Sequence, residues 1–180
     1  MRLLIVTQAV DQDDPVLGFF HRWIEVIAAQ VQAVHVICLK EGKHTLPASV
    51  HVHSLGKESG QSRLKYVTRL YAYVWKYRTE YDAVFVHMNQ EYVLLAGLVW
   101  KLLGKKIVLW RNHKKGSFMT TIACALADTV CYTSPAAYVA SARNALIMPV
   151  GIDTDEFMPR EAPKSGTVLF LGRLDPVKNV

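Results

Sequence analysis

Residues 148–180 read MPVGIDTDEFMPREAPKSGTVLFLGRLDPVKNV, and this stretch contains the boundary between two expected units. The polar segment 160–166 is followed by an apolar run of strand length, residues 167–171. That run continues directly into GRLDPVKN, in which a glycine turn precedes Arg173 and Lys178. A strand, a glycine turn and two nearby cations are typical of the start of an α/β domain that holds a diphosphate. The sequence therefore predicts that a second α/β domain begins after this boundary.

Upstream of the boundary, short apolar runs alternate with segments of helical periodicity. The expected strands are 3–6, 34–39, 51–55, 83–87, 107–110, 129–132 and 145–148. The expected helices are 18–32, 63–78, 93–103, 118–127 and a short one after Pro135. In the first of these helices, the residues expected on the inner face are Phe19, Trp23, Val26 and Ile27. Apolar strands separated by helices favour a mostly parallel sheet with helices on both faces, which is a doubly wound, Rossmann-like α/β fold.

The predicted organisation is a Rossmann-like domain at 1–159, a linker at 160–166, and the first strand and phosphate-loop motif of a truncated C-terminal domain at 167–180. A length of 180 residues agrees with one domain and a short extension. No apolar run reaches the roughly 18 residues that a membrane span needs, and the apolar run at the N-terminus is too short for a signal peptide. Three cysteines in apolar contexts favour buried reduced thiols over disulfides or a zinc site. These features together favour a cytoplasmic location.

In parallel sheets, ligands bind at the carboxyl ends of the strands, near a change in strand order. The segment after the first expected strand, residues 8–18, reads QAVDQDDPVLG and lacks the second glycine of a dinucleotide-binding fingerprint. Gly18 nevertheless opens a helix, where backbone N–H groups can bind an anion. Asp11, Asp13 and Asp14 are interpreted as a solvated acidic loop, because no other metal ligands lie nearby in the sequence. No metal site is predicted.

The loop after the expected strand 107–110 carries the densest set of chemically active side chains. It reads RNHKKGS, and its candidate binding residues are Arg111, Asn112, His113, Lys114 and Lys115. An imidazole can hydrogen-bond a sugar hydroxyl, and cations near a helix N-terminus can hold an anionic group. The alternative for the two lysines is that they are exposed charges without a binding role. Polar residues also stand at the end of the expected strand 83–87 and just after it, namely His87, Asn89 and Gln90, although a buried structural histidine is an equal alternative for His87.

Positive charge concentrates in the middle of the chain, although the net charge of the whole is +6. Residues 62–120 hold eleven Lys and Arg against three Asp and Glu. The expected helix 63–78 interleaves five of these cations with five aromatic residues, a composition that suits an anionic membrane surface. A long amphipathic helix at the protein surface is the alternative. Nucleic-acid binding is not predicted, because no recognition motif accompanies the charge.

The segment VGIDTDEFMP followed by VLFLGRLDPVKN resembles the junction between the two domains of retaining glycosyltransferases of family 4, which have the GT-B fold. Two motifs in the same order and at the same spacing carry this resemblance. Val150 and Asn179 depart from the Asn and Gly that the family has there. The resemblance implies that the chain is the N-terminal, acceptor-side half of such an enzyme. The donor-binding C-terminal domain would then lie beyond Val180.

The resemblance also implies an activity of the hexosyltransferase type, without a cofactor. A sugar would move from a nucleotide sugar to a carbohydrate or lipid-linked acceptor of the cell envelope with its anomeric configuration retained, and the chain alone would be inactive. His113 would lie beside the donor sugar as the catalytic candidate, and Gly18, Arg173 and Lys178 would bind the donor. The implied acceptor-binding residues are His87, Asn89, Arg111, Asn112, Lys114 and Lys115. The expected location is the cytoplasm, at the inner face of the membrane where helix 63–78 would bind it.

A different class of function is a stand-alone Rossmann-like module that binds an anionic metabolite, because many unrelated functions share this fold. A stand-alone module has no reason to carry GRLDPVK after its last strand. The junction motif therefore favours the enzyme.

Overall fold

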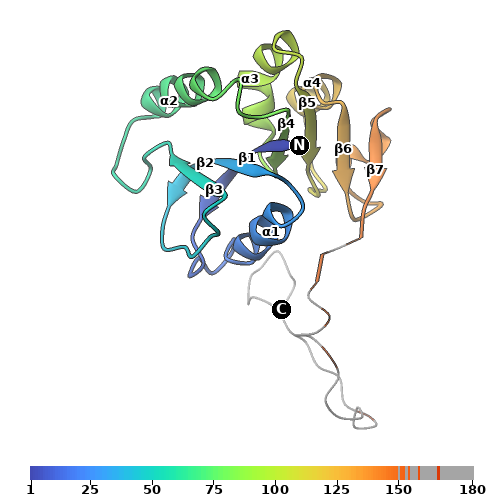
Figure 1. Ribbon diagram of the computed structural model, residues 1–180. Helices are drawn as coiled ribbons and strands as arrows, with labels where there is room; N and C mark the ends of the chain where they lie inside the picture. The colour runs from blue at the N-terminus through green and yellow to red at the C-terminus, as the bar shows by residue number, and fades with distance from the viewer. Residues whose placement is uncertain (150, 153, 155–157, 159–165, 167–180) are drawn as a thin grey trace. The chain divides into compact units, whose positions relative to one another are not determined.

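The computed structural model describes residues 1–149, 151, 152, 154, 158 and 166, and it shows a parallel sheet between two helical layers (Figure 1). The described strands are β1 Arg2–Val10, β2 Ala33–Glu41, β3 Val50–Ser54, β4 Ala83–His87, β5 Lys106–Trp110, β6 Thr129–Tyr132 and β7 Ala145–Ile147. The described helices are α1 Phe19–Ala28, α2 Arg63–Lys76, α3 Gln90–Leu102, α4 Phe118–Leu126 and the 3-10 turn η1 Tyr138–Ser141. The strand order is β3-β2-β1-β4-β5-β6-β7, and neighbouring strands in this described sheet run parallel to each other. The doubly wound, Rossmann-like prediction is confirmed.

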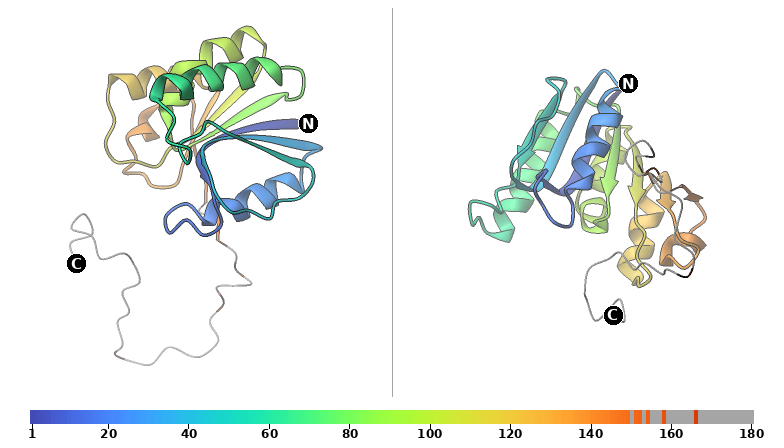
Figure 2. Two further views of the ribbon diagram at one scale, coloured as in Figure 1. Left: turned by 90° about the vertical axis from the view of Figure 1, so that its left-hand side faces the viewer. Right: turned by 90° about the horizontal axis from the view of Figure 1, so that it is seen from below.

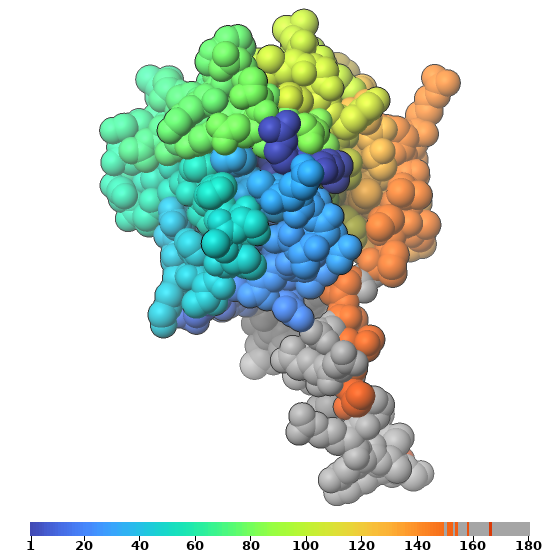
Figure 3. All heavy atoms as spheres, in the orientation of Figure 1, coloured from blue at the N-terminus to red at the C-terminus, as the bar shows by residue number. Residues whose placement is uncertain are grey.

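Strand β1 lies inside the sheet, because it pairs with β2 on one side and with β4 on the other. Its side chains alternate between two apolar cores, as the pleat of a strand requires. Leu4 and Val6 belong to the core beneath α2, α3 and α4, whereas Leu3 and Ile5 belong to the core beneath α1. Figure 2 shows these two helical layers on opposite faces of the sheet. In the space-filling view, the start of the chain lies between green residues above and light-blue residues below (Figure 3).

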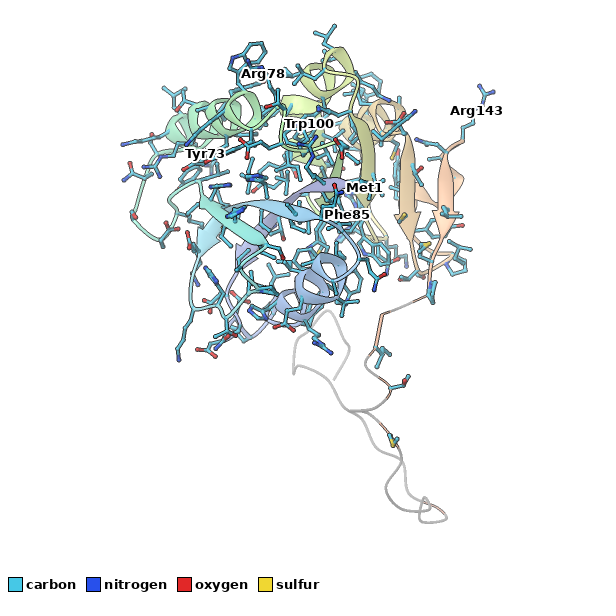
Figure 4. All side chains as sticks on the ribbon, viewed as in Figure 1. Met1, Tyr73, Arg78, Phe85, Trp100 and Arg143 are labelled. Atoms are coloured by element: carbon cyan, nitrogen blue, oxygen red, sulfur yellow. The ribbon has the colours of Figure 1, made fainter. Side chains whose placement is uncertain are left out.

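The larger core lies between the sheet and the layer formed by α2, α3 and α4. Trp100 of α3 and Leu70 of α2 are at most 1% exposed there, and Trp100 lies between its helix and the strands (Figure 4). Full burial of a leucine such as Leu70 contributes about 1.5–3 kcal/mol to the free energy of unfolding. Figure 4 also shows Tyr73 on the sheet side of α2, where its hydroxyl donates to the carbonyl of Ser54 over 3.3 Å. These contacts hold α2 and α3 against the same face of the sheet.

Helix α1 turns a different face to the sheet from the one that its sequence suggests. Phe19 and Val26 are each 51% exposed, whereas Phe20 and Ile24 are fully buried. Trp23 and Ile27 pack at the edge of this core, as predicted. The prediction for Phe19 and Val26 is wrong because two overlapping apolar stripes run along this helix, and the stripe through Phe20 and Ile24 is the one that contacts the strands.

The contacts of the chain divide it into one unit at 1–150 and another at 151–180. The expected linker 160–166 lies outside the described residues except for Gly166, and the expected strand 167–171 lies outside them entirely. The domain boundary at residue 159 therefore stays a prediction.

Two further expectations from composition can be compared with the structure. No helix among the described residues has the length and apolarity that crossing a bilayer requires. Cys38, Cys124 and Cys131 are all free and buried, as predicted for reduced thiols. Burial raises the pKa of each thiol, which keeps it protonated at neutral pH.

Candidate functional site

The order of the strands changes direction between β1 and β4, and this change in strand order locates the candidate site. From β1 the sheet continues to β2 and β3 on one side, and from β4 it continues to β5, β6 and β7 on the other. Ligands of doubly wound folds bind at the carboxyl ends of strands beside such a reversal. At this edge the side-chain amide of Gln8, in β1, donates a hydrogen bond to the amide oxygen of Asn89 over 2.7 Å.

A pocket of about 250 Å³ opens at the carboxyl ends of β4 and β5. It is lined by Met88, Asn89, Gln90, Glu91, Arg111, Asn112 and His113. Four of these residues, Asn89 and 111–113, are candidates from the sequence, and the parallel pairing of β4 with β5 brings their two loops together. Gln90 was also expected at this edge of the sheet, whereas Met88 and Glu91 are additional lining residues. We name this site the polar pocket.

The turn after β4 has an unusual backbone at the wall of the polar pocket. Met88 has a φ of 67°, in the left-handed region that residues with a side chain rarely adopt. Its N–H donates to the carbonyl of Trp110 over 2.7 Å, and the N–H of Asn89 donates to the carbonyl of His87 over 2.9 Å. Backbone strain of this kind clusters at functional sites. No signal in the sequence indicates it, since glycine or asparagine is the residue that favours this conformation.

Arg111 links the two loops that form the polar pocket. Its Nε donates to the side-chain oxygen of Gln90 over 2.9 Å, and its Nη2 donates to the carbonyl of Lys115 over 3.1 Å. The guanidinium is half-buried, so its position is fixed while its charge remains near the pocket. A fixed cation beside hydrogen-bonding side chains can orient a polar or anionic ligand.

His113 is exposed, and its two ring nitrogens have different surroundings. Nδ1 lies 3.0 Å from the backbone nitrogen of Lys115 and 2.9 Å from its carbonyl oxygen. It accepts from the former in one neutral tautomer and donates to the latter in the other. Among the described residues, no hydrogen bond engages Nε2. The ring is therefore held by one nitrogen, and the other can bond a ligand hydroxyl.

The loop that carries His113 is held in place by backbone and side-chain contacts. The side-chain oxygen of Asn112 accepts from the backbone nitrogens of Thr133 and Ser134, over 3.2 and 3.0 Å. The carbonyl of His113 accepts from the N–H of Tyr138 over 3.0 Å. A Cβ added at Gly116 would overlap the ring of Tyr138, so only glycine fits there. These contacts orient the imidazole before any ligand binds.

His87 lies beneath the polar pocket, since it is 2% exposed and does not line the wall. Its ring stacks on that of Phe20, with centroids 3.7 Å apart, and its Nδ1 lies 3.2 Å from the hydroxyl of Thr7. Burial lowers the pKa of His87 to about 4, so the ring is neutral at pH 7. The structure therefore gives His87 the surroundings of a core histidine, and its contact with an acceptor stays a prediction.

Gly18 is placed at the start of α1, away from the lining of the polar pocket. Its N–H donates to the carbonyl of Asp14 over 2.9 Å, and a Cβ at this position would lie 2.7 Å from that oxygen. Glycine is thus required by a close approach of the backbone. Because the N–H already has a partner, donor binding through Gly18 would need this loop to open, and it stays a prediction.

The remaining candidates fall in two places. Lys114 and Lys115 follow His113 in the same loop and are exposed, but their side chains do not line the polar pocket. Arg173 and Lys178 lie outside the described residues. No three His, Cys, Asp or Glu side chains within the described part of the chain are grouped in a way that could hold a metal ion.

Several solved structures have a similar fold. MurG of Acinetobacter baumannii has a TM-score of 0.53 at 13% identity, with 83% of this chain and 46% of that chain covered. The UDP-GlcNAc 2-epimerase of Methanocaldococcus jannaschii has a TM-score of 0.54 at 13% identity, covering 82% and 45%. The lipopolysaccharide outer core galactosyltransferase WaaB has a TM-score of 0.54 at 15% identity, covering 86% and 47%. The chain thus spans less than half the length of each of these proteins.

Sequence comparison gives the family. No curated protein matches the chain at a significant level. A family model described as glycosyl transferase 4-like matches residues 13–122, which is more than half of the chain and includes β4, β5 and the polar pocket between them. The match agrees with the parallel sheet, with the site at its reversal and with the resemblance of the junction motif. The chain belongs to the glycosyl transferase 4-like family.

Proposed function

We propose that residues 1–149 form the acceptor-side domain of a glycosyltransferase, which moves a sugar from a nucleotide sugar to a carbohydrate or lipid-linked acceptor with retention of configuration. The observation that carries the proposal is the polar pocket, which Asn89, Arg111 and His113 all line. An imidazole and an amide can hydrogen-bond the hydroxyls of a sugar, and a fixed cation can stabilise negative charge as a diphosphate departs. Family membership supports the same chemistry.

The donor half of the reaction is assigned to a second domain. Because the chain spans less than half of MurG and of WaaB, we propose that transfer takes place between this domain and a donor-binding one. Arg173 and Lys178 are proposed to hold the diphosphate, and Gly18 to contact the donor from the first domain. Lys114 and Lys115 are proposed to meet an anionic group of the acceptor.

The test compares the 180-residue chain with a longer protein that includes the donor-binding domain. We expect the longer protein to hydrolyse or transfer the sugar of UDP-glucose, UDP-N-acetylglucosamine or GDP-mannose, and the 180-residue chain to bind these donors weakly without turnover. Product formation by mass spectrometry and donor binding by calorimetry measure the two properties. Turnover by the 180-residue chain at the rate of the longer protein contradicts the proposal that donor and acceptor bind to two different domains. Binding of phosphate by the short chain, with no turnover by the long one, supports an anion-binding module instead.

We also propose that the outer surface of α2 and α3 binds the anionic inner face of a membrane. The four most exposed large apolar side chains on these two helices are Leu64 at 74%, Trp75 at 58%, Leu98 at 64% and Leu102 at 89%. The guanidinium of Arg78 lies 4.6 Å from the ring centroid of Trp75, outside the helix layer (Figure 4). Aromatic and aliphatic side chains flanked by cations are what a headgroup region accommodates. We name this surface the helical face.

Vesicle binding tests the helical face. We expect the chain to sediment with vesicles of phosphatidylcholine and phosphatidylglycerol, and to remain unbound with phosphatidylcholine alone. Leu102→Ser should weaken this binding roughly tenfold, because an inserted leucine contributes about 1.5–3 kcal/mol. Leu146→Ser, at a site on β7 that is 49% exposed, is the matched control and should leave binding unchanged. Equal binding of both variants, or equal binding to neutral vesicles, contradicts the proposal.

A further inference from the structure

A second pocket, of about 300 Å³, lies between α2 and α3 at the carboxyl ends of β2 and β3. This volume is at the lower end of the range for small-molecule sites, which is roughly 300–1,000 Å³. Its floor is apolar, because Leu55 and Leu70 are each 1% exposed and Tyr92 is 6% exposed. Val67 and Leu95 complete its sides. We name this site the apolar pocket.

The apolar pocket adjoins the polar pocket. Asn89 and Glu91 line both of them, so the turn between β4 and α3 forms a shared wall. A molecule that passes Asn89 can therefore place a polar end beside His113 and an apolar end against Leu70. The two adjoining pockets thus offer one polar and one largely apolar lining to a bound molecule.

Three of the polar side chains that line the apolar pocket, those of Tyr92, Arg63 and Glu91, are either bonded within the protein or exposed. The hydroxyl of Tyr92 donates to the carbonyl of Thr7 over 3.4 Å, so this group on the floor is satisfied within the protein. Arg63 and Glu91 line the pocket with exposed side chains. An apolar floor below a charged rim favours an alkyl chain over a sugar, because a buried hydroxyl without a partner costs about 1–3 kcal/mol.

The apolar pocket is continuous with the helical face. Leu95 lines the pocket and is 37% exposed, and Leu98 and Leu102 follow it three and seven residues later on the same side of α3. Tyr71 of α2 donates its hydroxyl to the carbonyl of Leu95 over 2.5 Å, which places the two helices side by side at this point. The apolar stripe of Leu95, Leu98 and Leu102 therefore extends from the pocket onto the helical face.

We propose that the apolar pocket holds the alkyl chain of a lipid-linked acceptor whose sugar end lies in the polar pocket. This inference rests on the proposed glycosyl transfer, and it selects the lipid-linked acceptor over the free carbohydrate. The apolar pocket gives specificity for the acceptor. An alkyl chain fills the space between Val67, Leu70 and Leu95, whereas an acceptor without an alkyl chain leaves water in that space.

Methyl NMR of the 180-residue chain, labelled at Leu and Val, tests the pocket without requiring activity. The probe is octyl β-glucoside below its micellar concentration, and methyl β-glucoside is the matched ligand without a chain. We expect the octyl probe to shift the methyl signals of Val67, Leu70 and Leu95, and to leave that of Val130, on β6, unchanged. Equal shifts with both probes, or shifts confined to Leu98 and Leu102, overturn the proposal.

A pocket-filling variant gives an independent result. Val67 is half-buried, and Val67→Phe should occupy the space and weaken octyl glucoside binding at least tenfold. Leu102→Ser, on the helical face, should leave that affinity unchanged. Octyl affinity that survives in Val67→Phe overturns the proposal. If Val67→Phe does not fold, the methyl shifts of the unaltered chain with the octyl and methyl probes decide whether the pocket binds an alkyl chain.

The pocket and the proposed function fail in distinguishable ways. Octyl binding at Val67 and Leu70, combined with no sugar transfer by a protein that includes the donor domain, retains the pocket and rejects glycosyl transfer. Transfer with the same KM for octyl and methyl glucoside as acceptors retains glycosyl transfer and rejects the pocket. Transfer with a KM at least tenfold lower for the octyl acceptor supports both.

Discussion

Replacing His113 with alanine will lower kcat/KM for sugar transfer about 10²-fold or more in the protein that carries both domains, and will leave Tm nearly unchanged. The imidazole is exposed, and the backbone of Lys115 holds its Nδ1. Its Nε2 can therefore bond a sugar hydroxyl that becomes more polar as the glycosidic bond to the diphosphate breaks. The loss of one such transition-state contact costs roughly 10²–10³-fold in rate.

The matched control for this variant is His51→Ala. His51 is also exposed, and it lies on the edge strand β3, which the sheet order separates from β4 and β5. Activity should survive this control. Steady-state kinetics and thermal unfolding, measured on both variants, separate a catalytic contribution from a structural one. If His113→Ala unfolds the domain or leaves turnover intact, His113 has no part in transfer.

The free energy of unfolding will fall steeply as the pH is lowered from 6.5 to 4, and His87 will account for a large part of the fall. Burial lowers the pKa of His87 from its usual 6.5 to about 4. Between pH 6.5 and 4, His87 is therefore protonated in the unfolded chain and neutral in the folded chain. The stability that is present above pH 6.5 is lost as the pH falls from 6.5 to 4. At about 1.36 kcal/mol per pKa unit, His87 alone contributes roughly 3 kcal/mol.

A glutamine at position 87 tests this assignment, because it can accept a hydrogen bond from Thr7 but does not titrate. Urea unfolding at several pH values should give a shallower decline for His87→Gln than for the unaltered chain between pH 6.5 and 4. Burial also lowers the pKa of His53 to about 4. The variant His53→Gln should therefore also lose stability less steeply than the unaltered chain between pH 6.5 and 4. Curves for His87→Gln that run parallel to those of the unaltered chain contradict the assignment.

The sheet was predictable because its strands are buried on both faces. Strands β4 and β6 have the expected bounds, Ala83–His87 and Thr129–Tyr132, since each is an apolar run between polar residues. Helix bounds were less accurate. Helix α3 begins at Gln90, three residues before the expected start, because the polar residues Gln90 and Glu91 form its first turn and add nothing to the apolar periodicity.

The candidate site was predictable in its location and only partly in its residues. The parallel pairing of β4 and β5 had to place Asn89 near Arg111 and His113, since their strands end at the same edge. The burial of His87 was not predictable, because a histidine at the end of a strand has the same sequence pattern whether its ring stacks on Phe20 or faces solvent. That distinction depends on the tilt of α1, which only tertiary packing determines.

The order of the sheet also determines how the chain can be assembled during synthesis. After β1, strands β2 and β3 extend the sheet in one direction. Strand β4 then pairs with the other side of β1, and β5, β6 and β7 follow it, each beside the strand before it. No strand has to enter between two that are already paired, so the domain can grow as the ribosome delivers it, from the N-terminus onward. Until residues 83–87 emerge, however, β1 has an open edge along Leu3–Val6, the segment that later pairs with β4. A nascent chain that pauses before that point exposes a flat apolar strand, and this interval is where a chaperone would most reduce aggregation.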